Sequence, residues 1–135
     1  MPPRASTSNP VDIGAAGPMV LSAERLIEIG RVIVSSGEVD ALILHGLGRA
    51  GFVRNETSVG RELWLELEKQ VMRGYDRLQQ EFRKPVILGS HHPSWESETI
   101  SELQGEGIRV LNRLDEIAQM LFRMYEYWRK IPEGE

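Results

Sequence analysis

Three short apolar runs along this chain have the pattern of β-strands. Residues 39–45, 85–89 and 108–111 are apolar with little polar alternation, which predicts strands that are mostly buried. We expect the first strand to be covered on both faces and to end at His45, and the weaker third strand to lie at an edge. Residues 9–14 alternate apolar and polar side chains, which predicts a short extended segment that can add a fourth strand.

Four longer stretches show the three- and four-residue spacing of amphipathic helices. Ser22 is predicted to cap the first helix, Ser94 or Ser97 the short third helix, and Asn112 the last, where Asp115 completes a box-like spacing. The tryptophans and methionines of the second and fourth helices stand at core spacing, so we expect them to be buried. The predicted stripes are Trp64, Leu67, Val71, Tyr75, Leu78 and Phe82 in the helix from Ser58 to about Phe82, and Leu114, Ile117, Met120/Leu121, Met124 and Trp128 in the last helix.

Strands that alternate with helices predict a parallel sheet joined by right-handed crossovers, with helices on both faces. We therefore expect an α/β protein, namely a small flavodoxin-like three-layer sandwich with a parallel sheet of about four strands. With 135 residues the chain has the length of one domain, which we assign to residues 9–135. Residues 1–8 are rich in Pro, Ser and Thr, a composition typical of a disordered tail or linker.

The composition excludes several classes of partner and chemistry. The chain has 16 Lys and Arg against 20 Asp and Glu, a net charge of −4, which gives no basic surface for nucleic acid or an anionic membrane. It has no cysteine, so disulfides and thiol nucleophiles are excluded. No apolar run approaches the roughly 20 residues of a membrane-spanning helix. We expect a cytoplasmic protein that binds neither nucleic acid nor membrane.

A glycine-rich loop follows the strand that ends at His45. Gly46, Gly48 and Gly51 have the G-x-G-x-x-G spacing of a dinucleotide-binding fingerprint. A true fingerprint continues directly into a helix and meets an acidic residue at the end of the next strand. Here several residues separate Gly51 from the helix start at Ser58, and the next strand ends without an acid. A nicotinamide or flavin site is therefore not expected, and the glycines can equally serve a turn with positive φ.

The same loop combines features that favour an anion. Arginine is permanently charged, and both a glycine-rich backbone and the start of a helix expose N–H donors. We expect the backbone around Gly48, Gly51 and Ser58 to donate hydrogen bonds to a phosphoryl group. The alternative is a solvated loop whose arginines contact no ligand. The candidate ligand-facing residues are His45, Gly46, Gly48, Arg49, Gly51, Arg54, Asn55, Thr57 and Ser58.

All three histidines follow predicted strands. His45 ends the first strand, while His91 and His92 follow the second, so their loops are expected to converge at one edge of the sheet. We interpret His45 and His91 as ligand contacts, with roles in loop structure as the alternative, and we take Ser90, His91 and His92 as the second candidate loop. Converging imidazoles can bind a metal, but adjacent residues 91 and 92 point in different directions, so no metal site is predicted. No catalytic residue is predicted either.

Four segments of the chain, taken in order, resemble a known module. They are Asn9-Pro-Val-Asp12, Val39-Asp-Ala-Leu-Ile-Leu44, Lys84-Pro-Val-Ile-Leu88 and Gly105-Glu-Gly-Ile-Arg-Val110. From Asn9 to about Trp128 the chain is similar to the carboxy-terminal flavodoxin-like domain of NDP-forming acyl-CoA synthetases, which are relatives of succinyl-CoA synthetase. Members of this family make an acyl-CoA from an acid, CoA and a nucleoside triphosphate through a phosphohistidine.

The resemblance implies a part in a larger enzyme. In that family two helices aim their amino termini at the phosphohistidine, so the loop from Gly46 to Ser58 would face the phosphate. The CoA-binding and ATP-grasp domains, and with them CoA, ATP or ADP and Mg, would belong to other domains or subunits. The isolated chain would then be incomplete as an enzyme. The alternative is a non-catalytic flavodoxin-like module that binds a small anionic ligand or a partner domain, and both interpretations allow a homo-oligomer.

Overall fold

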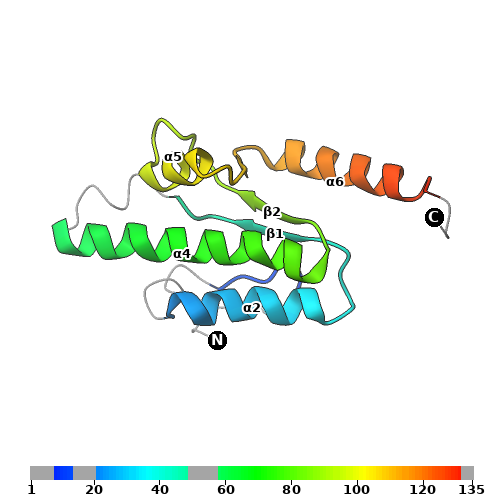
Figure 1. Ribbon diagram of the computed structural model, residues 1–135, viewed down its shortest axis with the longest axis horizontal. Helices are drawn as coiled ribbons and strands as arrows, with labels where there is room; N and C mark the ends of the chain where they lie inside the picture. The colour runs from blue at the N-terminus through cyan, green and yellow to red at the C-terminus, as the bar shows by residue number, and fades with distance from the viewer. Residues whose placement is uncertain (1–7, 14–20, 49–57, 132–135) are drawn as a thin grey trace.

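The computed structural model describes residues 8–13, 21–48 and 58–131. Helices and strands alternate along these residues as predicted, and the protein has an α/β fold (Figure 1). In chain order the elements are α2 (Ala23–Ser35), β1 (Leu42–His45), α4 (Ser58–Phe82), β2 (Val86–Gly89), α5 (Glu98–Gly105), β3 (Val110–Leu111) and α6 (Leu114–Trp128).

The described sheet has three parallel strands in the order β1-β2-β3. Leu42 pairs with Val86, and Leu88 with Val110, so the register runs without interruption across the sheet. The sheet has one strand fewer than expected. Of residues 9–13, Asp12 alone forms a bridge, and no strand is present among them.

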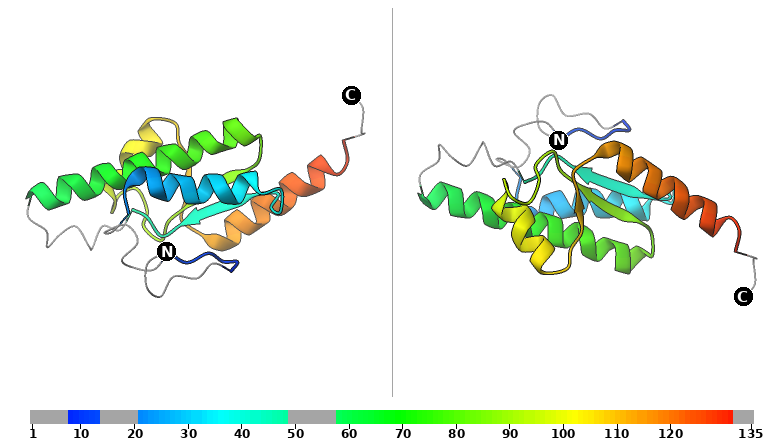
Figure 2. Two further views of the ribbon diagram at one scale, coloured as in Figure 1. Left: turned by 90° about the horizontal axis from the view of Figure 1, so that it is seen from below. Right: turned by 90° about the horizontal axis from the view of Figure 1, so that it is seen from above.

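Helices cover both faces of the sheet, as expected for a three-layer sandwich. Figure 2 shows α2, α4 and α5 on one side and α6 on the other. Leu44 and Leu88 belong to the core between the sheet and α4. Because side chains alternate along a strand, His45 and Gly89 point to the opposite face, where Ile117 of α6 packs.

The first strand is less covered than its apolar sequence predicts. The side chain of Ile43 in β1 is 41% exposed, whereas β2 is buried throughout. The expectation that β1 would be covered on both faces is therefore wrong. β1 lies at an edge of the described sheet. On the face opposite the main core, the described helix is α6, and it contacts β2 and β3. The third strand lies at the other edge, as predicted.

Helices α2 and α4 approach closely because each places a glycine beneath a side chain of the other. A Cβ atom on Gly30 would stand 2.6 Å from the Tyr75 ring, and one on Gly74 would overlap Ile27. The Tyr75 hydroxyl donates a hydrogen bond to the Leu26 carbonyl oxygen at 3.0 Å. Burial raises the pKa of Tyr75 to about 12, because the phenolate would lose its hydration.

The apolar stripe predicted for α4 is confirmed at Val71, Tyr75 and Leu78, which are buried. Met72 is buried, as expected for the methionines of this helix, and Glu68 and Gly74 are buried as well, although the predicted stripe omitted all three. The helix has 25 residues, yet none of the described helices is both long and apolar enough to cross a membrane.

Two of the predicted helix caps are confirmed. The hydroxyls of Ser22 and Ser97 each accept a hydrogen bond from the backbone N–H three residues further on. The cap predicted at Asn112 is wrong. α6 begins later, with Arg113 in the capping position and no side-chain cap, because Asp115 accepts hydrogen bonds from the Arg113 guanidinium instead.

The last helix extends past the sheet (Figures 1 and 2). Ile117, near its start, is fully buried, but Trp128 at its end is 70% exposed and Met124 is exposed as well. The expectation that the tryptophan and methionines of this helix belong to the core is therefore wrong for its second half. The periodic stripe continues where the sheet beneath it has ended.

Candidate functional site

The carboxyl ends of β1 and β2 lie side by side, with His45 paired to Gly89 in the register. The chain continues from β1 through Gly46 to Gly48, and from β2 through Ser90 to His92. The start of the first candidate loop and the second candidate loop therefore meet at the carboxyl edge of the sheet, which is the side where the parallel strands end. This edge is where ligands are usually held in open parallel sheets.

Ser90 joins the two loops. Its hydroxyl is fully buried and donates a hydrogen bond to the Leu47 carbonyl oxygen at 2.7 Å. The Ser90 hydroxyl oxygen also accepts a hydrogen bond from the His92 backbone N–H at 3.1 Å, and the Ser90 N–H donates to the Leu111 carbonyl oxygen at 2.9 Å. Ser90 therefore has a structural role that ties β1, β2 and β3 together at their carboxyl ends.

A buried carboxylate, Glu68 of α4, lies against this edge. One oxygen accepts a hydrogen bond from the Gly48 N–H at 2.8 Å, and the other accepts one from the Thr99 hydroxyl at 3.0 Å. Both side chains are 1% exposed. Sequence reasoning missed this pair, although a signal was present: position 68 lies four residues after Trp64 and three before Val71, within the apolar stripe of the helix.

The hydrogen bond to Glu68 corrects the expected role of Gly48. Its backbone has a φ of +83°, which favours glycine, but its N–H binds Glu68 and is not free to donate to an anion. Gly48 also lies beside Glu68 rather than beside Ser58, where α4 begins. At 1.5 Å per residue, this separation along the helix axis is about 15 Å. The Gly48 turn and the amino terminus of α4 therefore do not converge on one point.

His45 and His91 form an imidazole pair at the same edge. Their ring centroids are 4.3 Å apart and the rings are nearly perpendicular. The Nε2 atom of His45 is buried and has no hydrogen-bond partner among the described residues. Burial of the ring lowers the pKa of His45, and repulsion from His91 lowers it further. His45 is therefore held in the neutral form and contributes no permanent positive charge.

Glycine is required at position 89 for the His45 ring to lie where it does. A Cβ atom there would stand 2.6 Å from His45 Cδ2 and 2.8 Å from Ile117 Cδ1. The ring consequently packs between β2 and α6 on the face of the sheet opposite the main core. The burial of the ring in this position explains why protonating His45 is unfavourable and why its pKa is lowered.

His92 points to a different partner. Its Nδ1 atom lies 3.7 Å from a carboxylate oxygen of Glu96, one turn further on. Within residues 8–13, 21–48 and 58–131, no three His, Asp or Glu side chains are grouped closely enough to hold a metal ion. The structure thus brings His45 and His91 together and directs His92 elsewhere.

Several predicted site residues belong to the part of the chain that the structure does not describe. Arg49, Gly51, Arg54, Asn55 and Thr57 lie outside the described residues. Ser58 is the first residue of α4, as predicted, and its side chain also lies outside the description.

The fold and the site together define a class of protein. It is a small parallel α/β protein whose candidate site lies at the carboxyl edge of β1 and β2. No protein-family model, curated protein or solved structure matches this chain.

Proposed function

We propose that this chain is the flavodoxin-like domain of an NDP-forming acyl-CoA synthetase. In this role it docks against another domain and stabilises a phosphohistidine and its phosphate, which that domain supplies. CoA, ATP and Mg are bound by the complete enzyme and not by this chain alone. The proposal rests on the ordered sequence segments that resemble this family.

One structural observation supports the proposal most directly. The hydrogen bond from Ser90 Oγ to the Leu47 carbonyl oxygen holds the two candidate loops together at the carboxyl edge of a parallel sheet. Ligands bind at such edges because neighbouring loops part there. An acceptor surface for a group delivered by another domain needs a preformed and rigid edge of this kind.

The charge that would stabilise the phosphate has to come from the arginines. His45 is held neutral, and the Gly48 N–H is committed to the Glu68 carboxylate. Arg49 and Arg54 follow within a few residues of this edge and remain charged at any physiological pH. They are therefore the residues assigned to the anion, with the backbone of the intervening loop.

The anion site is tested by titrating the ¹⁵N-labelled chain with inorganic phosphate and following the amide resonances. The resonance of Gly46 should shift, and the variant Arg49→Ala/Arg54→Ala should lose this response. Arg109→Ala, which removes an exposed arginine before β3, is the matched control and should respond like the unaltered chain. An unchanged response in the double variant would refute the assignment of these arginines.

A second experiment separates the synthetase domain from a module that binds anions without catalysis. The probe is the CoA-binding domain of a succinyl-CoA synthetase, with and without phosphate on its histidine. The chain should bind the phosphorylated form more tightly, and it should form no acyl-CoA when given acid, CoA, ATP and Mg alone. Equal or absent binding of the two forms favours the non-catalytic module, and acyl-CoA formation by the isolated chain contradicts the domain role.

A further inference from the structure

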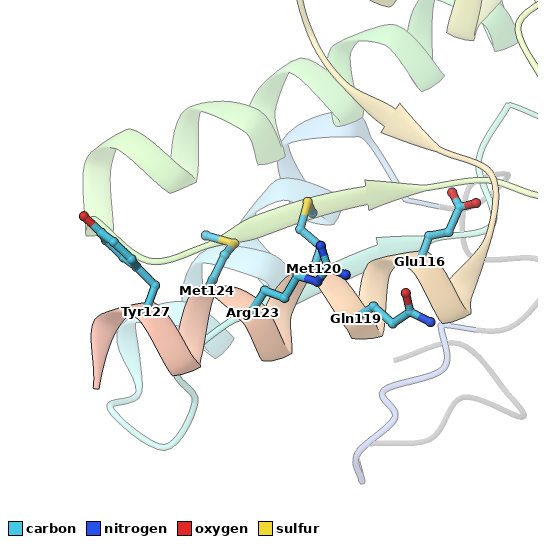
Figure 3. A pocket seen from close by; sticks show the side chains of 6 residues that line it. All are labelled: Glu116, Gln119, Met120, Arg123, Met124 and Tyr127. Atoms are coloured by element: carbon cyan, nitrogen blue, oxygen red, sulfur yellow. The ribbon is translucent and has the colours of Figure 1, made fainter. Parts of the chain in front are cut away.

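A shallow groove of about 460 Å³ runs along one side of α6. Figure 3 shows its lining side chains following one another along the helix. Every described residue that lines it belongs to α6 itself, so neither the sheet nor another described helix fills it. Its apolar part consists of Met120, Met124 and Tyr127, and its polar part of Glu116, Gln119 and Arg123.

Trp128, at the end of the same helix, is a large side chain that is exposed to solvent. Trp128 is 70% exposed, and its neighbour Tyr127 is exposed to a similar extent. Both belong to the carboxyl end of α6, and this end of the helix extends past the sheet (Figure 1). Contiguous exposed apolar surface of this kind marks an interaction site, and tryptophan is the residue most enriched at the centre of such sites. The methionines that line the groove suit an aromatic ring, because their side chains are flexible and polarizable.

We propose that α6 forms the interface of an antiparallel homodimer, in which Trp128 of each copy fills the Met120–Met124–Tyr127 groove of the other. The groove and Trp128 lie on the same helix, with Trp128 beyond the middle of the groove toward the carboxyl end. Two antiparallel copies related by a twofold axis can therefore make this contact twice. Such a contact is isologous and closes on itself, as in most homodimers.

Charge selects the antiparallel direction. Glu116 lies at the amino end of the groove and Arg123 lies further along it, while Arg129 and Lys130 follow Trp128 directly. When Trp128 enters the groove of an antiparallel partner, the two cations that follow it point toward Glu116. A parallel pairing would carry them toward Arg123, where like charges repel.

Glu116 and Arg129 can exchange their present ion pairs for contacts with a second copy at little cost in free energy. Glu116 is 3.5 Å from the Arg113 Nε atom, and Arg129 is 3.2 Å from Glu126. In both pairs the partners are three residues apart in sequence and lie at the surface, where an ion pair contributes little to stability. Exchanging them for contacts between two copies therefore loses little.

The dimer is tested by sedimentation velocity of the full chain from low to high micromolar concentration. We expect a reversible monomer–dimer equilibrium whose dissociation constant rises at least about tenfold in Trp128→Ser. Trp95→Ser is the matched control, because Trp95 is 81% exposed but lies outside α6, and it should leave the equilibrium unchanged. A chain that stays monomeric throughout, or an equal effect of both substitutions, overturns the proposal.

Reversing charges tests the direction of the pairing. Glu116→Lys should weaken the dimer, and so should Arg129→Glu/Lys130→Glu, whereas the combined triple variant should recover much of the lost association. A triple variant that associates no better than its parents overturns the antiparallel arrangement. Far-ultraviolet circular dichroism confirms that each variant keeps its helices, so that loss of folding cannot pass for loss of the dimer.

Discussion

The Glu68 carboxylate accepts a hydrogen bond from the Gly48 N–H at 2.8 Å and thereby fastens the turn after β1 to α4. Its second oxygen accepts a hydrogen bond from the Thr99 hydroxyl, so the same side chain also reaches α5. A buried carboxylate is stable only when such donors replace its hydration. Glu68 therefore determines where the glycine-rich loop begins, and it removes one backbone donor from the set that could bind an anion.

Removing this carboxylate should destabilise the protein. Glu68→Ala leaves two buried donors unsatisfied and opens a cavity, which should lower the free energy of unfolding by about 2–4 kcal/mol. Thr99→Val removes one of the two hydrogen bonds and should cost about 1 kcal/mol, while Thr99→Ser, which keeps the hydroxyl, should cost less. Denaturant unfolding measures these values. Native-state hydrogen exchange provides the specific readout: an unchanged exchange rate of the Gly48 amide in Glu68→Ala would contradict the contact.

Gly48 should tolerate no side chain. Its φ of +83° is unfavourable for other residues, and a Cβ atom would stand 2.8 Å from Ile100 Cδ1. Gly48→Ala should therefore lower the free energy of unfolding by about 1–3 kcal/mol. Gly105→Ala is the control, because a Cβ atom at that helical position meets nothing within 4 Å and should be neutral or slightly stabilising. Equal stabilities for the two variants would show that the turn is not constrained as described.

The stability of the protein should decline on mild acidification because of His45. Its pKa in the folded state lies below the ordinary value of 6.5, chiefly through burial and secondly through His91. Below that ordinary value the unfolded chain binds the proton more readily than the folded chain. The contribution is therefore complete above about pH 7 and is lost as the pH falls through the lowered pKa.

Imidazole resonances followed by NMR as a function of pH measure this shift directly. His91→Ala removes the smaller cause, so the pKa of His45 should move only part of the way back toward its ordinary value. The variant His45→Gln should lose this part of the acid sensitivity. A His45 that titrates at or above its ordinary pKa would be incompatible with the buried pair.

At alkaline pH the group that makes the stability of the protein depend on pH is Tyr75. Its pKa is raised from 10.0 to about 12 in the folded protein, so the unfolded chain releases the phenolic proton first. The contribution to stability is complete below pH 10 and is lost as the pH rises toward 12, by roughly 1–3 kcal/mol. Tyr75→Phe should be less stable at neutral pH by about 1 kcal/mol, since it loses the hydrogen bond to Leu26, but it should lack this alkaline loss. Denaturant unfolding of both proteins at pH 8 and pH 11 provides the comparison.

The elements of the fold could be predicted because their signals are local. Apolar runs identified β2 and β3, three- and four-residue spacing identified the helices, and the hydroxyls of Ser22 and Ser97 marked two helix starts. The cap at Asn112 was mispredicted because a neighbouring arginine competed for Asp115. That competition depends on side-chain geometry that residue spacing does not contain.

The meeting of the two candidate loops was predictable, but the contacts between them and the helices were not. Two parallel strands that end in His45 and Gly89 have to present their following loops at the same edge, whatever the details of packing. The contact between Glu68 and Gly48 joins residues that are far apart along the chain, and no periodic pattern specifies which donor a buried carboxylate will find.

By itself, then, the sequence determined the alternation of strands and helices, the α/β class and the end of the sheet at which the two candidate loops meet, because these follow from local periodicity and strand direction. Only the tertiary structure decided how much of each apolar surface is covered. Ile43 and Trp128 belong to apolar patterns as regular as those of buried residues, yet both are exposed, because burial depends on what lies opposite a side chain. β1 lies at an edge of the described sheet, where α6 packs against β2 and β3 instead, and the end of α6 extends past this sheet (Figure 1).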